Sequence, residues 1–291
     1  MKRVFVVLIG LVFLLVDTSF LLAQETGDES GILDGAYLRR HNQDRKPVPY
    51  QYVREADVMW SKKVWRIIDL HEKMNHILYY PERPMQDRFS LIDLMMKSIE
   101  ANEITAYNPN ASEFDEFAEP TTFEQIKITF GAVDEEIDVE DENGNVTKKK
   151  IKGAYNSSEV KQYMIKEEWF FDKQRSVLEV RIVGICPIRF YYKPDDINQE
   201  NVQKAKLFWV YFPHARKVFA NHLVFNVKND AQYLTFDDIF FKRFFTSFIY
   251  QESNSYNNRA INQYALGLES LMESERIQDN IRNFESDLWE Y

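Results

Sequence analysis

The spacing of apolar residues in the first third of the chain predicts helices. Trp60, Val64, Ile67 and Ile68 fall at positions i, i+4, i+7 and i+8, which places them on one stripe of a helix over 57–75. A similar spacing over 87–102 predicts a second amphipathic helix. We therefore expect an N-terminal pair of helices, each with one apolar face turned toward a core.

The middle of the chain changes to the alternation that is typical of strands. Apolar residues alternate with Glu179 and Arg181, which predicts a half-buried strand over 177–186. We expect further strands over 123–133, 188–192, 207–212 and 218–227, and a helical stretch over 157–166. Helices first, strands next and helices last predict an α+β fold with a central antiparallel sheet rather than an alternating α/β fold.

Residues 134–152 form a segment of concentrated charge. Seven acidic residues come before Asn143-Gly144 and four lysines follow it. Asn-Gly is a strong signal for a two-residue hairpin turn, because both turn positions require positive φ. Pairing across this turn would set Asp138 opposite Lys149 and Glu135 opposite Lys152. Two interpretations stay open: a solvated hairpin whose charges offset each other, and a finger that docks on another protein.

The last part of the chain returns to helical spacing. Thr235 with Asp238 resembles a capping box at the start of a helix that we expect to reach about Tyr250, and 257–291 predicts a further long helix. Phenylalanines at every fourth position, and a C-terminal apolar row spaced by four, three and four, fit either the subunit's own core or a partner contact. The candidates for a partner interface are Phe240, Phe244, Phe248, Ile277, Ile281, Phe284, Leu288 and Trp289.

The N-terminus predicts export. Lys2 and Arg3 precede an unbroken apolar run over 4–16, and Ala23 lies where a signal peptidase would cut. The run is shorter than the roughly 20 residues that a membrane span needs. Residue 24 is Gln rather than Cys, so the mature chain has no thiol there to carry a lipid. We expect no direct membrane span, and any attachment to a membrane would depend on a partner.

These observations divide the chain into four parts. We expect a signal peptide over 1–23, an extended N-terminal arm over 24–56, an α+β core domain over 57–256 and a C-terminal helical segment over 257–291. Two prolines in 46–52 disfavour helix and support the extended arm. Because no clear linker interrupts the core, we expect it to fold as one body.

Composition excludes several classes of protein. With 22 Phe, 16 Tyr and 5 Trp, the chain has too many aromatic residues to be disordered. The net charge of −10 argues against nucleic acid as a partner, because a phosphate backbone needs a basic surface. The single cysteine cannot form an intrachain disulfide or a cysteine-rich zinc site.

Candidate chemistry is sparse. His71 and His76 are five residues apart, so on a helix they would point about 140° apart and could not share a metal as the histidines of HExxH do. The acidic run does not fit a calcium loop, since Gly144 falls one position late and Lys149 stands where the loop needs Glu. Cys186, at the end of a predicted strand, is expected to be a buried structural thiol. We therefore expect no catalytic residue, no metal and no cofactor.

Several long strings of the sequence resemble one known family. The strings are DVMWSKKVWRIIDL at 57–70, EEWFFDKQRS at 167–176, DAQYLTFDDIFFKRFFT at 230–246, ESNSY at 252–256 and LESLMESERI at 268–277. They resemble the gliding motility protein family GldN, also called PorN, and the resemblance extends over essentially the whole chain from about Gly31.

The resemblance implies a function that the residues alone do not. It implies a non-enzymatic, periplasmic component of the type IX secretion and gliding motility machinery of Bacteroidota. It further implies a ring of neighbouring copies at the inner face of the outer membrane, built with the lipoprotein GldK or PorK, and a contact with the inner-membrane motor protein GldM or PorM. A chain without its own lipid fits this arrangement, because the lipoprotein would hold it at the membrane.

Two other functions stay open at this point. A periplasmic ligand- or peptide-binding domain would use the aromatic residues to line a concave pocket. A hydrolase with an unrecognised site would need Cys186 or a histidine beside a buried carboxylate.

Overall fold

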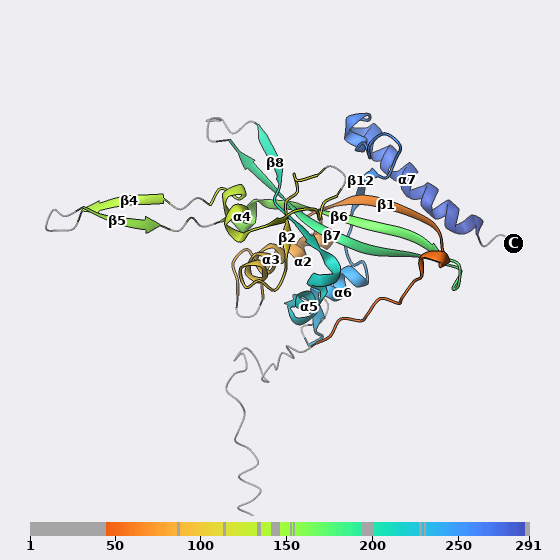
Figure 1. Ribbon diagram of the computed structural model, residues 1–291, viewed down its shortest axis with the longest axis horizontal. Coiled ribbons are helices and arrows are strands. Elements are labelled where there is room, and N and C mark those ends of the chain that lie inside the picture. Colours follow the sequence, from red (N-terminus) through yellow and green to blue (C-terminus); the bar gives the residue numbers. More distant parts are fainter. Residues whose placement is uncertain are drawn as a thin grey trace, which may run out of the picture. The chain divides into compact units, whose positions relative to one another are not determined.

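Three long antiparallel strands organise the fold. They are β1 (Val58–Asp69), β6 (Val160–Asp172) and β7 (Val177–Tyr192), which lie side by side in a sheet of eight strands (Figure 1). The order across the sheet is β12-β1-β6-β7-β9-β2-β3, and β8 pairs with the far end of β7. The shorter strands are β2 (Ala106–Tyr107), β3 (Pro120–Thr121), β8 (Val202–Lys206), β9 (Trp209–Tyr211) and β12 (Phe248–Glu252).

The computed structural model describes residues 45–85, 88–112, 115–132, 135–140, 146–151, 153, 155–193, 201–226, 229 and 231–288. The predicted signal peptide, the arm as far as residue 44, Asn143-Gly144 and Trp289 lie outside the described residues.

Helices and two small hairpins connect the strands of the sheet. The helices are α2 (His76–Tyr79), α3 (Leu91–Glu100), α4 (Phe123–Thr129), α5 (Phe212–Asn221), α6 (Phe236–Phe241) and α7 (Leu268–Asp287). Single 3-10 turns are η1 (Glu55–Asp57), η2 (Lys73–Asn75), η3 (Ser157–Glu159) and η4 (Ile261–Gln263). The hairpins pair β4 (Glu135–Glu140) with β5 (Val146–Ile151), and β10 (Leu223–Val224) with β11 (Leu234–Thr235).

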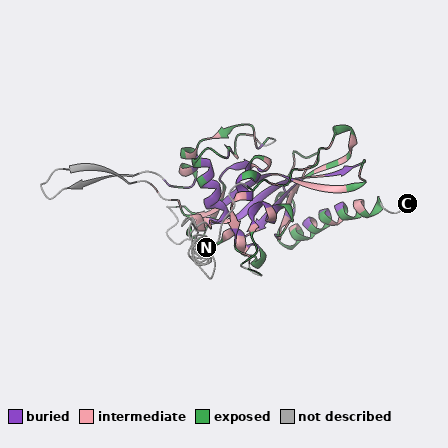
Figure 2. Ribbon diagram, turned by 90° about the horizontal axis from the view of Figure 1, so that it is seen from below, coloured by how far each residue is buried: buried purple, intermediate pink, exposed green. Residues whose placement is uncertain are grey.

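The main core lies between the sheet and the helices α3, α5 and α6. Ile68 of β1, Tyr163 of β6 and Ile182 of β7 belong to one buried cluster with side chains of these helices. Leu94 of α3 and Phe219 of α5 are fully buried in it. Figure 2 shows the buried residues gathered where the helices meet the strands. The helices therefore bury one face of the long strands.

The C-terminal helix α7 docks against the edge of the sheet at β12. Ile277 and Ile281 are buried with Ile249 of β12, and Phe284 stacks on Trp60 of β1 with ring centroids 4.6 Å apart. The hydroxyl of Ser274 accepts a hydrogen bond of 2.9 Å from the backbone N–H of Ile249. Because edge strands otherwise offer unpaired backbone groups, α7 closes this edge with both apolar and polar contacts.

The opposite face of the long strands is buried as well. Trp65 and Met164 lie there in a cluster with Trp209 of β9. The segment between β2 and β3 crosses this cluster and brings Phe117 against Gly184 of β7. A Cβ atom at position 184 would lie 2.6 Å from Cζ of Phe117, so only glycine leaves room for this close approach.

The predicted α+β class with a large antiparallel sheet is confirmed, but the helix predicted over 57–75 is wrong. This stretch contains β1, followed by η2 and α2. Trp60, Val64 and Ile68 are spaced by four, an interval that also returns to the same face of a strand. Only Val64–Ile68, in the second half of β1, is buried on both faces, so the alternation that marks a strand is lost there.

Three other sequence-based predictions are wrong for related reasons. The stretch 157–166 is η3 followed by β6, and 123–133 contains the helix α4, which Thr122 and Gln125 cap in a capping box. Most of 218–227 belongs to the end of α5 or lies outside regular structure, and only β10 is a strand there. Each is a short stretch with too few apolar residues for their period to distinguish a helix from a strand.

The helix predicted over 235–250 begins as expected but ends early. Thr235 and Asp238 form the predicted capping box, and the helix α6 ends at Phe241. Arg243 takes a positive φ of 56°, and the N–H of Phe244 bonds to the carbonyl of Ile239 at 2.9 Å, which is a Schellman ending. Phe248 therefore lies on β12 and not on the helix of Phe240.

The remaining elements agree with prediction more closely. The helix over 87–102 is confirmed as α3, and the C-terminal helical segment contains α7. The strands over 177–186 and 188–192 are one continuous strand, β7, and β9 covers part of 207–212. The charged hairpin is confirmed, but Asp138 lies opposite Lys148 and Glu135 opposite Ile151. This register leaves five residues between the paired Glu140 and Val146, where a two-residue turn was expected.

We expect Gly184→Ala to lower the free energy of unfolding by about 1–3 kcal/mol, because the added methyl group overpacks the contact with Phe117. Chemical denaturation followed by tryptophan fluorescence would measure the loss. Phe117→Leu serves as the matched change, and the double variant should lose less than the sum of the two single variants. Equal stability of Gly184→Ala and the wild type would contradict this packing.

Candidate functional site

The side chains that most often carry chemistry are engaged in structural contacts. His71 lies in the turn after β1, with Nδ1 2.7 Å from Oδ1 of Asp69. Nε2 of His76 lies 3.3 Å from the carbonyl oxygen of His71. Within the described part of the chain, no group of three or more His, Cys, Asp or Glu side chains could hold a metal ion.

Cys186 is a buried thiol of the sheet, as predicted from the sequence. It lies on β7 and is fully buried in the cluster with Trp65 and Trp209. Burial raises the pKa of this thiol to about 12, against which nearby Lys206 has only a smaller, lowering effect. A thiol with so high a pKa is protonated at neutral pH and is a poor nucleophile.

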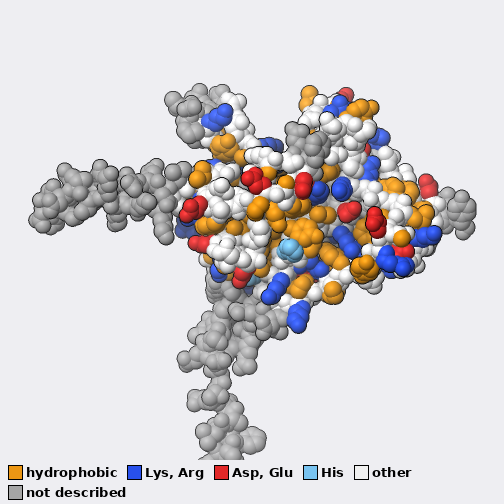
Figure 3. Space-filling view, in the orientation of Figure 1, with side chains coloured by type: hydrophobic (Ala, Val, Ile, Leu, Met, Phe, Trp, Pro, Cys, Tyr) orange, Lys and Arg blue, Asp and Glu red, His pale blue; other side chains and the backbone are white. Residues whose placement is uncertain are grey.

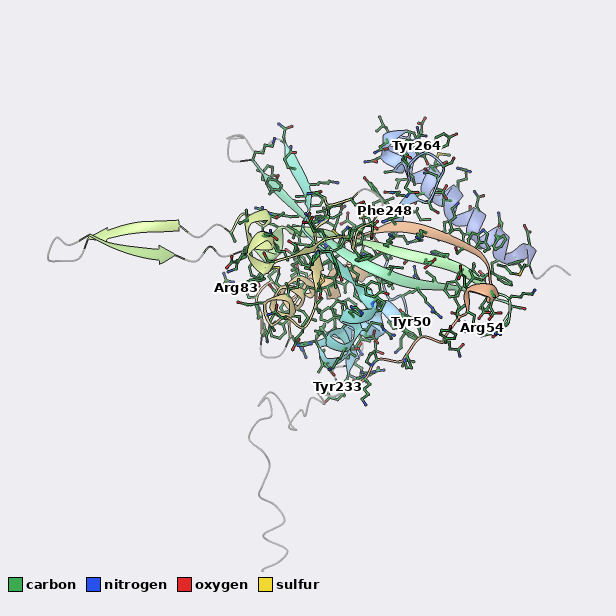
Figure 4. The ribbon with its side chains drawn as sticks, in the orientation of Figure 1. Tyr50, Arg54, Arg83, Tyr233, Phe248 and Tyr264 are labelled. Carbon is green, nitrogen blue, oxygen red and sulfur yellow. The ribbon has the colours of Figure 1, made fainter. Side chains whose placement is uncertain are left out.

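Tyr50, which Figure 4 labels, holds the arm on the body, and the guanidinium groups of two arginines lie within cation–π distance of its ring. The guanidinium of Arg216 is 4.4 Å from the centre of the Tyr50 ring, and that of Arg181 is 5.1 Å from it. The ring also stacks on Phe241 at 6.1 Å, and Arg181 donates a hydrogen bond of 2.6 Å to the carbonyl of Gln51. Burial raises the pKa of Tyr50, and Arg216 opposes this rise in pKa.

We call Tyr50 and the two arginines beside it, Arg181 and Arg216, the clamp. A buried ion pair fixes Arg216 in this clamp. Nε and Nη2 of Arg216 donate to the two carboxylate oxygens of Asp237 at 2.8 and 3.1 Å. Both side chains are buried between α5 and α6. The bidentate geometry holds the guanidinium plane in place, so that one face of it is available to Tyr50.

A cavity of about 440 Å³ lies between the arm, β7 and the end of α6. Tyr50, Phe240 and Phe241 contribute aromatic rings to its wall, and Arg175 and Arg181 contribute guanidinium groups. Nη2 of Arg175 and Nε of Arg181 are buried and have no hydrogen-bond partner within the described structure. The wall of the cavity therefore combines aromatic rings with guanidinium groups.

The structure separates the residues that the sequence proposed for a partner interface. Phe240, Ile277 and Ile281 are buried inside the subunit, and Phe284 and Phe248 are partly buried against the sheet. Phe244 and Leu288 are exposed, at 45% and 37%. The row Ile277, Ile281 and Phe284 is brought together in the docking of α7, whereas Phe240, Phe244 and Phe248 do not share one helix face.

Exposed apolar residues gather at the start of α7, where sequence reasoning did not look. Leu266, Leu268, Leu271 and Met272 are 77%, 72%, 50% and 61% exposed, and we call these four residues the α7 surface. Leu268, Leu271 and Met272 are spaced by three and four, so they share one face of the helix. The sequence could have predicted this surface from the second apolar row of α7, which lies on a different face of the helix from the buried row of Ile277 and Ile281.

A second set of exposed apolar residues lies on α6 and on the segments before and after it. Phe225, Tyr233, Phe241 and Phe244 are each between 45% and 47% exposed, and we call them the α6 surface. Phe225 follows Val224 and Tyr233 precedes Leu234, so both flank the last pair of the β10–β11 ladder. In Figure 3 hydrophobic side chains show over α5 and α6, and again over the start of α7.

Comparison with known proteins identifies the family. A family model described as "Gliding motility associated protein GldN" matches residues 53–290. The chain belongs to the GldN family. A search of curated proteins gives no match.

Membership in the GldN family makes the chain a component of gliding motility and type IX secretion machinery. The matched residues include the whole described sheet, both exposed surfaces and α7. No helix in the described part of this GldN-family chain has the length and apolar character needed to cross a membrane. The features to explain are therefore the clamp on the arm and the two exposed apolar surfaces.

We expect Tyr50→Ala to release the arm from the body of this GldN-family chain. Loss of the contacts with Arg216 and Phe241 removes about 1–2 kcal/mol of aromatic and cation–π interaction, so trypsin should cut after Arg54 about tenfold faster. Tyr52→Ala is the matched control, because Tyr52 is 88% exposed. Equal cleavage rates for the two variants would show that Tyr50 does not hold the arm.

We expect Cys186 to resist thiol reagents at pH 8 until the chain unfolds. The raised pKa of about 12 and full burial both suppress thiolate formation in the native state. Since the folded pKa lies above the unfolded pKa, the thiol's contribution to stability is complete below the unfolded pKa and is lost as pH rises toward 12. Labelling followed by mass spectrometry, with Cys186→Ala as the blank, tests this, and rapid native labelling would contradict it.

Proposed function

We propose that the chain is a non-enzymatic structural subunit of the periplasmic ring of the type IX secretion and gliding motility machinery. In this proposal it assembles with the outer-membrane lipoprotein GldK or PorK and contacts the motor protein GldM or PorM. The observation that carries the proposal is the family match over residues 53–290, which spans nearly all of the described structure. The exposed α6 and α7 surfaces support it, because a subunit that assembles with others needs apolar contact area.

The proposed location is the periplasm, at the inner face of the outer membrane. The N-terminal sequence supports export, since Lys2, Arg3 and the apolar run 4–16 have the organisation of a signal peptide ending at Ala23. Gln24 supports an anchor borrowed from a lipoprotein partner, because the chain offers no cysteine for acylation at that position.

A structural role is further supported by the way the chain uses its charged and aromatic side chains. Arg216 and Asp237 hold the clamp on Tyr50, and Lys166 pairs with Glu116 inside the fold. Among the interface candidates, Phe244 and Leu288 are exposed and could contact partners directly. Phe240, Phe248, Ile277, Ile281 and Phe284 would contribute by supporting the surface elements from within.

A second candidate function is a periplasmic ligand- or peptide-binding domain. The cavity of about 440 Å³ with aromatic rings on its wall favours it. The charges around the cavity are largely engaged, since Arg175 pairs with Asp172 and with Glu179. We rank this function below the structural one for that reason.

Co-expression with the GldK-type lipoprotein tests the proposed function. We expect the two proteins to purify together as large ring-shaped particles in electron microscopy, and a deletion strain to lose type IX secretion until the wild-type gene is restored. Two results together would overturn the proposal: the chain stays monomeric when the lipoprotein is present, and the deletion strain secretes normally. Saturable peptide binding that Phe241→Ala abolishes in such a monomer would favour the second candidate.

A further inference from the structure

The two exposed apolar surfaces lie at different ends of the described body. Figure 4 labels Tyr264, which precedes α7, and Tyr233, which belongs to the α6 surface, and the two residues lie far apart in that view. One copy of the chain cannot bring these surfaces together on itself. Each surface is therefore available to a different neighbour.

The α7 surface has an acidic surround. The helix α7 contains six acidic residues and two arginines, and both arginines form ion pairs within the helix, Arg276 with Glu273 and Arg282 with Asp279. Glu269 and Glu275 are exposed beside Leu268, Leu271 and Met272. Apolar side chains and negative charge thus share this end of the molecule.

The α6 surface has a basic surround. Arg88 lies 5.4 Å from the centre of the Phe225 ring, and Lys217 and Lys242 are exposed on α5 and just after α6. The acids of this region are already paired: Asp237 with Arg216, and Asp238 with both Arg45 and Lys242. Among the described residues named here, five cations (Arg45, Arg88, Arg216, Lys217 and Lys242) outnumber the two carboxylates, so their net charge is positive.

We propose that the α7 surface of one copy docks on the α6 surface of the next copy. This inference rests on the proposed function and names the faces through which neighbouring copies meet. Leu271 and Met272 would enter among Phe225, Tyr233 and Phe244, a contact that combines apolar burial with favourable sulfur–aromatic packing. Glu269 and Glu275 would face Lys217 and Lys242 at the rim, where opposite charges set the orientation of the two copies.

The charges also determine the symmetry of the contact. A twofold contact between two α7 surfaces would set acids against acids, and one between two α6 surfaces would set lysines against lysines. A head-to-tail contact avoids both juxtapositions. Because a head-to-tail contact leaves one free surface of each kind at its ends, it continues from copy to copy, and it forms a ring when the rotation between copies closes.

Site-directed cross-linking tests the docking in cells that express the full chain. We use two double variants, Leu271→Cys/Phe244→Cys and Met272→Cys/Phe225→Cys, with a short bismaleimide. All four positions are exposed, and the native Cys186 is buried, so the introduced thiols are the ones that react. We expect at least one double variant to give a ladder of covalent multimers. When the two matching single-cysteine variants are mixed instead, the products should stop at dimers.

Control variants separate this contact from chance collisions. Leu271→Cys/Met59→Cys carries its second thiol on β1, at a residue that is 66% exposed and outside both surfaces, and should give no ladder. Lys217→Glu/Lys242→Glu should remove the ladder, and adding Glu269→Lys/Glu275→Lys should restore it. Circular dichroism would confirm that each variant folds.

The outcomes also separate this inference from the proposed function. Absence of a ladder from both double variants, or a homodimer from Leu271→Cys alone, would overturn the head-to-tail docking. If those same variants still purify with the GldK-type lipoprotein in large particles, only the docking is wrong. If the wild type and the folded variants all fail to associate with the lipoprotein, the proposed function is wrong.

Discussion

Burial on both faces of the stretch where β1, β6 and β7 lie side by side, around Val64–Ile68 of β1, is the constraint on which the rest of the fold depends. Strands this long expose two apolar faces, and each face needs its own cover. The helices α3, α5 and α6 cover one face, while the segment with Glu116 and Phe117 covers the other. Glu116 brings a carboxylate into that cover, where it pairs with Lys166 and accepts a hydrogen bond of 2.8 Å from Trp65. A charge buried in this way is tolerated only because it is paired.

The same constraint explains which parts of the fold could be predicted. α7 was predictable, because its buried row contacts a single surface and keeps a clear helical period. β1 was not, because residues spaced by four return to the same face in both a helix and a strand. α4 was missed although Thr122 and Gln125 carried a readable capping box. The early end of α6 depends on the positive φ of Arg243, for which the sequence offers no glycine as a signal.

The candidate surfaces could be predicted only in part, since burial depends on the tertiary neighbours of each residue. Phe240 and Phe244 look alike in sequence, yet Phe240 meets Phe212 and Phe219 while Phe244 meets solvent. Leu268 and Leu271 look like core residues and are exposed. The clamp on Tyr50 joins residues far apart in the chain, so no local sequence pattern predicts it. What the sequence did carry was the resemblance, which pointed to assembly before any surface could be named.

The pairing of β1 with β12 has a consequence for the way the chain is made. Val64 pairs with Glu252, and the edge beyond β12 is closed by Ser274 near the start of α7. A ribosome delivers β1 well before β12 and α7, so this sheet edge stays open while the residues between them are made. Contacts between segments so distant in sequence also form slowly. The unfinished chain therefore carries an open sheet edge, with unpaired backbone groups along β1, through which it could aggregate until β12 and α7 cover it.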